Sequence, residues 1–115
     1  MTPKLSVIGA GNVGAECARQ IVQKGLADVA LIDVVDGLPQ GKALDLLQAG
    51  PIGQYDTVIT GSNDFSALKD SRLVIVTAGL ARKPGMSRDD LLQKNAEIIT
   101  SVVENIKKYA PEAII

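Results

Sequence analysis

Short apolar runs alternate along the chain with longer segments of helical periodicity. The short runs predict strands, because brief β-branched stretches bounded by turn residues are typical of buried strands. Four strands are expected, over residues 4–8, 28–33, 55–60 and 72–77. Helices are expected over residues 12–24, 41–48 and 87–110, with a shorter one over 63–70. This alternation predicts an α/β fold with a parallel sheet, since each helix connects parallel neighbours.

The last helix and the residues after it are the most clearly delimited part of the pattern. Ser87 with Asp90 three residues later predicts a capping box at its start. Its apolar face is expected to run for five turns, through Leu91, Leu92, Asn95, Ile98, Ile99, Val102, Val103 and Ile106. Pro111 stops the helix, and residues 113–115 then look like the opening of a fifth strand. In the first helix, Val13, Cys17 and Ile21 are expected to face the sheet, as are Ala18 and Val22.

A glycine-rich turn joins the first strand to the first helix. It has the pattern G-x-G-x-x-G and consists of Gly9, Ala10, Gly11, Asn12, Val13 and Gly14. In this context Gly9 permits the tight turn, Gly11 lets a pyrophosphate approach the backbone, and Gly14 lets the helix lie close to the sheet. The free N–H groups of the helix start would face the phosphates. The alternative is a plain turn between strand and helix.

Asp33 ends the second strand, 19 residues after Gly14. A carboxylate at this spacing accepts hydrogen bonds from an adenosine ribose diol and repels a 2′-phosphate, so NAD is favoured over NADP. Asp36 lies nearby and is able to share the role, although the spacing favours Asp33. The alternative is a solvated acid at a strand end.

Composition excludes several other classes of function. The net charge is −1 with three aromatic residues, so no basic field or stacking platform for nucleic acid is available. The absence of histidine excludes a histidine base or metal ligand, and the single cysteine excludes an internal disulfide or a cysteine-rich zinc site. No metal site is expected. No segment reaches the roughly 18 apolar residues of a membrane span, and no leader is recognisable, so the cytoplasm is the expected compartment.

The segment between the fourth strand and the last helix carries three cations and no acid. Arg82, Lys83 and Arg88 lie within seven residues, after a strand whose carboxyl end is expected at the ligand edge of the sheet. Gly79 and Gly85 allow this segment to move as a lid. A solvated loop is the alternative.

Taken together, these motifs resemble the amino-terminal part of an NAD-dependent malate dehydrogenase of the lactate/malate dehydrogenase family. The resemblance rests on GAGNVG at 9–14, Asp33, GLPQGKALDL at 37–46 and TAGLARKPGMSRDDLLQKNAEII at 77–99. It implies a Rossmann-type, doubly wound parallel sheet that is cut inside its fifth strand. Residues 1–115 would be an NAD-binding domain, incomplete at its carboxyl end and lacking the substrate domain.

The resemblance also assigns roles to single residues. The glycine turn and Asp33 would bind NAD, the backbone of Thr77, Ala78 and Gly79 would line the cofactor, and Asn95 would contact it unless it is a satisfied buried amide. Arg88 would polarise the substrate carbonyl. Arg82 would bind the distal carboxylate of the dicarboxylate substrate. Relatives that act on lactate typically carry a neutral residue at the position that matches Arg82.

The implied activity is the reversible oxidation of (S)-malate to oxaloacetate with NAD as cofactor. The alternatives are a lactate dehydrogenase or another 2-hydroxy-acid dehydrogenase, and a stand-alone NAD-binding regulatory module that would leave the arginines unexplained. No catalytic residue is assigned in this chain, because the expected proton acceptor is a histidine beyond Ile115. The chain alone is therefore expected to be inactive, and the complete enzyme to be a dimer or tetramer of identical subunits.

Overall fold

Four parallel strands form one sheet in the order β3-β2-β1-β4. The computed structural model describes residues 2–115. The strands are β1 (Lys4–Ile8), β2 (Asp28–Ile32), β3 (Ile59–Ser62) and β4 (Leu73–Val76). The helices are α1 (Asn12–Gln23), α2 (Leu38–Gln48), α3 (Gly50–Gly53) and α4 (Arg88–Tyr109), with a short 3₁₀ helix, η1 (Phe65–Leu68). The predicted α/β fold with a parallel sheet is confirmed.

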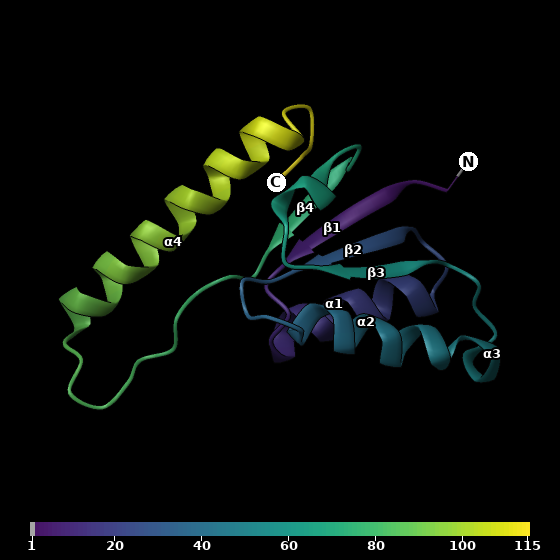
Figure 1. Ribbon diagram of the computed structural model, residues 1–115, viewed down its shortest axis with the longest axis horizontal. Helices are drawn as coiled ribbons and strands as arrows, with labels where there is room; N and C mark the ends of the chain where they lie inside the picture. Colours follow the sequence, from purple (N-terminus) through teal and green to yellow (C-terminus); the bar gives the residue numbers. More distant parts are fainter. Residues whose placement is uncertain (1) are drawn as a thin grey trace.

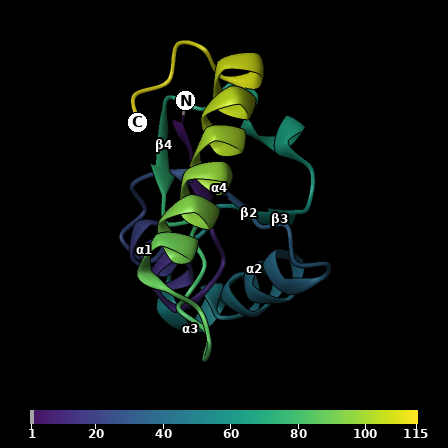
Figure 2. The same ribbon diagram turned by 90° about the vertical axis from the view of Figure 1, so that its left-hand side faces the viewer.

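Helices cover both faces of the sheet, as a doubly wound fold requires. In Figure 1, α1 and α2 lie below the strands, whereas α4 runs along the opposite side. Figure 2 is turned by 90°, so that α4 lies in front of the strands. The core on the α1 and α2 face includes Val7 and Leu31. The core on the α4 face includes Ile8, Ile32 and Leu68. Neighbouring residues of one strand thus point to opposite layers, and both layers exclude water.

The residues after α4 return to the sheet beside β4. Ile114 forms a parallel bridge with Leu73. The Val74 amide donates to the Ile114 carbonyl at 2.8 Å, and the Ile114 amide donates to the Arg72 carbonyl at 3.0 Å. The predicted opening of a fifth strand is confirmed as this single bridge on the outer edge of β4.

The start of α4 has the predicted capping box. The Asp90 amide donates to Ser87 Oγ at 3.0 Å, and the Ser87 amide donates to Asp90 Oδ2 at 3.2 Å. Both groups are free donors at a helix start, so the two bonds define where the helix begins.

Two predicted apolar faces are covered only in part. On α4, Val102 and Ile106 are buried, but Leu92 is 70% exposed. Figure 1 gives the reason, because the first half of α4 extends past the sheet. On α1, the face that meets the sheet carries Gly14, Ala18, Ile21 and Val22. Val13 lies in the first turn on another face and is 71% exposed.

The short helix α3 was not expected, and several element boundaries differ from the prediction. The second helix was expected over residues 41–48, but α2 begins at Leu38 and has Pro39 in its first turn. Proline is tolerated there since the first helical N–H groups need no partner within the helix. The third strand was expected over residues 55–60 but spans Ile59–Ser62. Thr57, which was expected in the strand, has a side-chain bond to α1 instead: its Oγ1 donates to the Val22 carbonyl at 2.6 Å.

Candidate functional site

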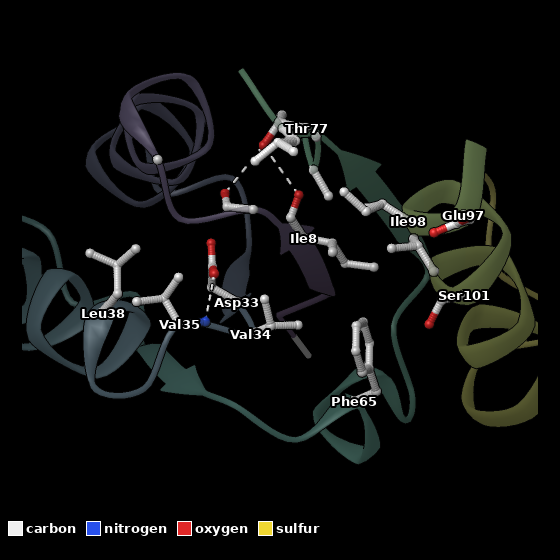
Figure 3. Close-up of a pocket in the computed structure, with 16 residues that line it drawn as sticks. Ile8, Asp33, Val34, Val35, Leu38, Phe65, Thr77, Glu97, Ile98 and Ser101 are labelled. Atoms are coloured by element: carbon white, nitrogen blue, oxygen red, sulfur yellow. Dashed lines mark hydrogen bonds between the residues drawn. The ribbon is translucent and has the colours of Figure 1, made fainter. Parts of the chain in front are cut away.

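A largely apolar cavity of about 580 Å³ opens at the carboxyl ends of β1, β2 and β4. This is where the strand order reverses, since β1 has β2 on one side and β4 on the other, and ligands of open α/β sheets bind at such a point. Figure 3 shows Asp33 inside the cavity, Thr77 above it, and Phe65 and α4 side chains along one wall. The lining residues come from β1, the turns after β1, β2 and β4, the start of α2, η1 and α4.

The glycine turn that follows β1 is shaped by close backbone contacts. Gly9 has a φ of +106°, which other residues rarely adopt, and a Cβ there would lie 2.5 Å from Thr77 Oγ1. A Cβ on Gly14 would lie 1.7 Å from the Gly9 carbonyl oxygen. A Cβ on Gly11 would have no atom within 4 Å. Gly11 therefore has open space beside it and lines the cavity, whereas Gly9 and Gly14 are fixed by neighbouring atoms.

Thr77 ties this turn to the end of β4. Its amide donates to the Ile8 carbonyl at 2.8 Å. Its hydroxyl lies 3.1 Å from the Ile8 carbonyl oxygen and 3.2 Å from that of Gly9, as Figure 3 shows. On the other side, the Gly9 amide donates to the Ile32 carbonyl at 2.8 Å. The turn is thus bonded to both strands that flank β1.

Asp33 joins the end of β2 to the glycine turn through its carboxylate. Oδ2 accepts from the Ala10 amide at 2.7 Å, and Oδ1 accepts from the Val35 amide at 2.9 Å. Each carboxylate oxygen has two lone pairs, so each can accept a further hydrogen bond from a ligand in the cavity. Asp36 is exposed and is not among the lining residues, so the geometry favours Asp33.

The other predicted cofactor-binding residues lie in three different places. Ala78 and Gly79 line the cavity directly after Thr77. Ala10 is fully buried and offers its amide to Asp33. Asn12 and Val13 are exposed at the start of α1 and line a separate shallow hollow.

Asn95 holds the first part of the segment after β4. Its Oδ1 accepts from the Leu80 amide at 2.7 Å, and its Nδ2 donates to the Leu80 carbonyl at 3.5 Å. Leu80 lines the cavity, but Asn95 does not. The side chain is therefore a partly buried amide that binds the Leu80 backbone, and its predicted contact with the cofactor stays a prediction.

Arg82 and Arg88 lie on the exposed segment that leads away from the sheet. Figure 1 shows this segment in green, extending beyond the carboxyl ends of the strands. Arg82 Nε donates to the Met86 carbonyl at 3.2 Å, and Arg88 is the first residue of α4. Both side chains are exposed, and neither lines the cavity.

The apolar walls of the cavity were not predicted as functional. Val34 and Val35 follow β2 directly and are 78% and 55% exposed. The opposite wall contains Phe65, Ile98 and Val102. The sequence did offer one signal for the first wall, because two adjacent valines follow Asp33, a residue already predicted to bind the ligand. The opposite wall left none, because its members lie far apart in sequence.

Two carboxyl groups with a shifted pKa lie outside the cavity. Hydrogen bonds from the side chains of Arg19 and Gln20 lower the pKa of Glu16 to about 2. The backbone amide of Ser66 lowers the pKa of Asp64, whose Oδ1 caps η1 at 2.8 Å. Both shifts belong to local helix-start or helix-surface bonds, since their partners lie two to four residues away.

No helix of residues 2–115 has the length and apolar character needed to span a bilayer. Over the same residues, no three His, Cys, Asp or Glu side chains gather in a way that would hold a metal ion.

The cavity has the features that a dinucleotide requires. Gly11 leaves its backbone open to phosphate at the start of α1, and backbone N–H groups at a helix start attract anions. The Asp33 carboxylate keeps acceptor capacity for a ribose diol. The apolar walls beyond it provide a surface for a flat ring.

Comparisons with known proteins agree with this geometry. Residues 3–115 match the family model described as lactate/malate dehydrogenase, NAD binding domain. The malate dehydrogenase of Methanosarcina barkeri is 56% identical over 112 residues, which cover 97% of this chain and 36% of that protein. The apo malate dehydrogenase from Picrophilus torridus has a TM-score of 0.94 at 50% identity, covering 98% of this chain and 36% of that one.

A third comparison includes the cofactor. The malate dehydrogenase from Archaeoglobus fulgidus in complex with NADH has a TM-score of 0.89 and 43% identity, over 96% of this chain and 38% of that one. The chain thus spans little more than a third of the length of the relatives that it matches. The residues that it does contain form the Rossmann-type part, with NAD as the cofactor. The chain belongs to the lactate/malate dehydrogenase family and corresponds to the NAD-binding domain of that family.

Proposed function

We propose that this chain is the cofactor-binding part of a malate dehydrogenase, which interconverts (S)-malate and oxaloacetate with NAD. The observation that carries the proposal is the continuity between the cavity and the arginine segment. Thr77, Ala78, Gly79 and Leu80 line the cavity, and Arg82 follows two residues later. A cation is therefore tethered directly to the wall of the cofactor cavity. The similarity to malate dehydrogenases over nearly the whole chain supports the same reading.

The residues of the cavity would hold NAD, whose nicotinamide ring would supply the hydride acceptor for the carbon that carries the substrate hydroxyl. The chain's own residues bind and orient the dinucleotide. Gly11 and the start of α1 hold the pyrophosphate, and Asp33 accepts hydrogen bonds from the ribose diol of the adenosine half. The backbone of residues 77–79 lines the cofactor. Asn95 contributes by holding the Leu80 backbone against this wall, and we retain it as a residue of the cofactor site.

Two arginines then act on the substrate. Arg82 pairs with the distal carboxylate of the dicarboxylate, because a guanidinium can bind a carboxylate through two parallel hydrogen bonds. Arg88 polarises the carbonyl that becomes the malate hydroxyl. Both side chains are exposed on a segment with glycines at 79 and 85, so closure of this segment over the cavity brings them to the substrate.

Other parts of the reaction lie outside these residues. The chain contains no histidine, so none of its residues is proposed as the proton acceptor. We also propose a cytoplasmic homo-oligomer, a dimer or tetramer. Exposed apolar side chains on α2 and α3, namely Leu44, Leu47 and Ile52, support an interface on that side of the sheet.

The test is a NADH oxidation assay on the full-length protein that carries this chain, with oxaloacetate and pyruvate as competing substrates. We expect kcat/KM for oxaloacetate to exceed that for pyruvate by at least about 30-fold. Pyruvate has no distal carboxylate, so it would leave the Arg82 cation unpaired in the closed site, which costs roughly 2 kcal/mol or more. A higher kcat/KM for pyruvate would instead identify a lactate dehydrogenase. NADH binding without turnover of either substrate would identify an NAD-binding regulatory module.

Asp33→Asn in the full-length protein should weaken NADH binding and reduce the preference for NADH over NADPH. Asparagine has one acceptor oxygen, so either the Ala10 or the Val35 amide loses its partner, and the charge that repels a 2′-phosphate disappears. Hydrogen bonds to a charged group contribute about 1.5–3 kcal/mol, so KM for NADH should rise roughly 10- to 150-fold. Asp36→Asn is the matched control and should leave the KM values for NADH and NADPH unchanged. The assignment fails if the Asp36 variant changes cofactor preference and the Asp33 variant does not.

A further inference from the structure

Asn63 lies directly after β3 and binds the loop between β2 and α2 with both ends of its amide. Its Nδ2 donates to the carbonyls of Asp33 and Val35, each at 2.8 Å. Its Oδ1 accepts from Gln40 Nε2 at 2.6 Å and from the Gly37 amide at 3.4 Å. One half-buried side chain thus holds the start, middle and end of the loop 33–37.

The loop itself has few other attachments. The Asp33 amide donates to the Ser62 carbonyl at 3.2 Å, and the Leu38 amide donates to the Val35 carbonyl at 3.2 Å. Val34 is 78% exposed and Val35 is 55% exposed, so neither valine anchors the loop by burial. Removing the Asn63 amide therefore takes a donor from the Asp33 carbonyl and leaves the Val35 carbonyl with only the Leu38 amide as its donor.

The position of Val35 matters to the Asp33 carboxylate, because the Val35 amide donates to Asp33 Oδ1 at 2.9 Å. A displacement of Val35 changes one of the two hydrogen bonds that orient this carboxylate. The second, from the Ala10 amide, comes from the glycine turn and is independent of Asn63. Asn63 thus acts on the carboxylate through the loop backbone, over a sequence separation of 30 residues.

We propose that Asn63 is a positioning residue for cofactor selectivity: it fixes the loop 33–37, and through it the Asp33 carboxylate and the valine wall that meet the adenosine half of NAD. The proposal rests on the cofactor placement given under the proposed function. Asn63 does not line the cavity, so its effect on the cofactor is indirect. The chemistry it governs is recognition of a 2′,3′-diol against a 2′-phosphate.

The test compares Asn63→Ala with Asn105→Ala in the full-length protein. Asn105 is the matched control, because its Nδ2 also donates to a backbone carbonyl, that of Ser101 on its own helix, at 2.8 Å. We expect Asn63→Ala to raise KM and Kd for NADH about tenfold and to change NADPH binding less, so that the preference for NADH narrows. The kcat at saturating NADH and the KM for oxaloacetate should stay unchanged. Asn105→Ala should match the wild type in all of these.

A merely structural role for Asn63 predicts a different pattern. Fewer folded molecules would lower the apparent kcat and leave KM for NADH unchanged, and this result would overturn the proposal. If Asn63→Ala does not fold, Asn63→Asp replaces it, since the carboxylate keeps the acceptor for Gly37 and Gln40 but loses both donors. An unchanged NADH affinity and cofactor preference in that variant would also overturn it.

Direct titration of NADH by fluorescence separates this proposal from the proposed function. Absence of oxaloacetate turnover by the wild type contradicts the malate dehydrogenase assignment, but the Kd ratio between variant and wild type still decides the role of Asn63. Equal Kd values in a folded, fully active variant reject the positioning role and leave the assigned activity intact.

Discussion

Replacing Arg82 by glutamine in the full-length protein should lower kcat/KM for oxaloacetate between about 30-fold and several thousand-fold and shift preference towards pyruvate. The estimate follows from the roughly 2–5 kcal/mol that a closed site loses when one partner of a charge pair is removed. Arg82 is exposed, and within residues 2–115 no acid pairs with it; its Nε binds the Met86 carbonyl. The guanidinium is thus available for a substrate carboxylate.

The control for this substitution is the adjacent cation. Lys83→Gln removes the same charge from the same exposed segment and should change kcat/KM for oxaloacetate less than threefold or so, in keeping with the small effects of solvated charges. Arg82→Lys should recover only part of the activity, because an ammonium cannot bind a carboxylate bidentately. If Arg82→Gln leaves the ratio of kcat/KM for oxaloacetate to kcat/KM for pyruvate unchanged, Arg82 does not bind the substrate.

Gly14→Ala should destabilise the fold by at least about 3 kcal/mol, because its methyl group would overlap backbone and not a movable side-chain end. The added Cβ would lie 1.7 Å from the Gly9 carbonyl oxygen and 2.7 Å from Thr77 Oγ1. Either α1 moves away from the sheet or the glycine turn is distorted. Since domains are stable by only about 5–15 kcal/mol, the loss should be evident in thermal and urea unfolding of the full-length protein.

Substitutions at two further glycines separate an effect on stability from an effect on NADH binding. Gly11→Ala meets no atom within 4 Å, so it should unfold like the wild type but bind NADH weakly, because the methyl group occupies the phosphate approach. Gly41→Ala on the exposed side of α2 also meets no atom and should stabilise the protein by about 0.5–1 kcal/mol, since alanine favours helix. A Gly14→Ala variant that unfolds like the wild type would contradict the close approach described for α1.

Local signals predicted much of the fold. The short apolar runs located β1 and β2, and Ser87 with Asp90 located the start of α4. The errors arose where a residue's partner is distant in sequence. Thr57 bonds to the Val22 carbonyl instead of extending β3, and Leu92 is exposed because its half of α4 has no sheet beside it.

The same division applies to the cavity. The glycine spacing and Asp33 were readable, because motif and carboxylate each follow a strand. The roles of Asn63 and of the Thr77 hydroxyl were not, since their partners lie 28 and more residues away along the chain. No periodicity encodes a pairing of that kind. The assignments of Arg82, Arg88 and Asn95 came from the family resemblance and stay predictions for experiment.

The bonding of the glycine turn to both neighbouring strands has a consequence for how a ligand associates. Thr77 fixes one side of the turn, Ile32 fixes another, and Asp33 holds the Ala10 amide between them. The backbone that we propose to bind the phosphates is therefore ordered by the sheet itself. Conformational entropy lost on binding then falls mainly on the rotatable bonds of the dinucleotide, and the protein side of the contact contributes its full attraction.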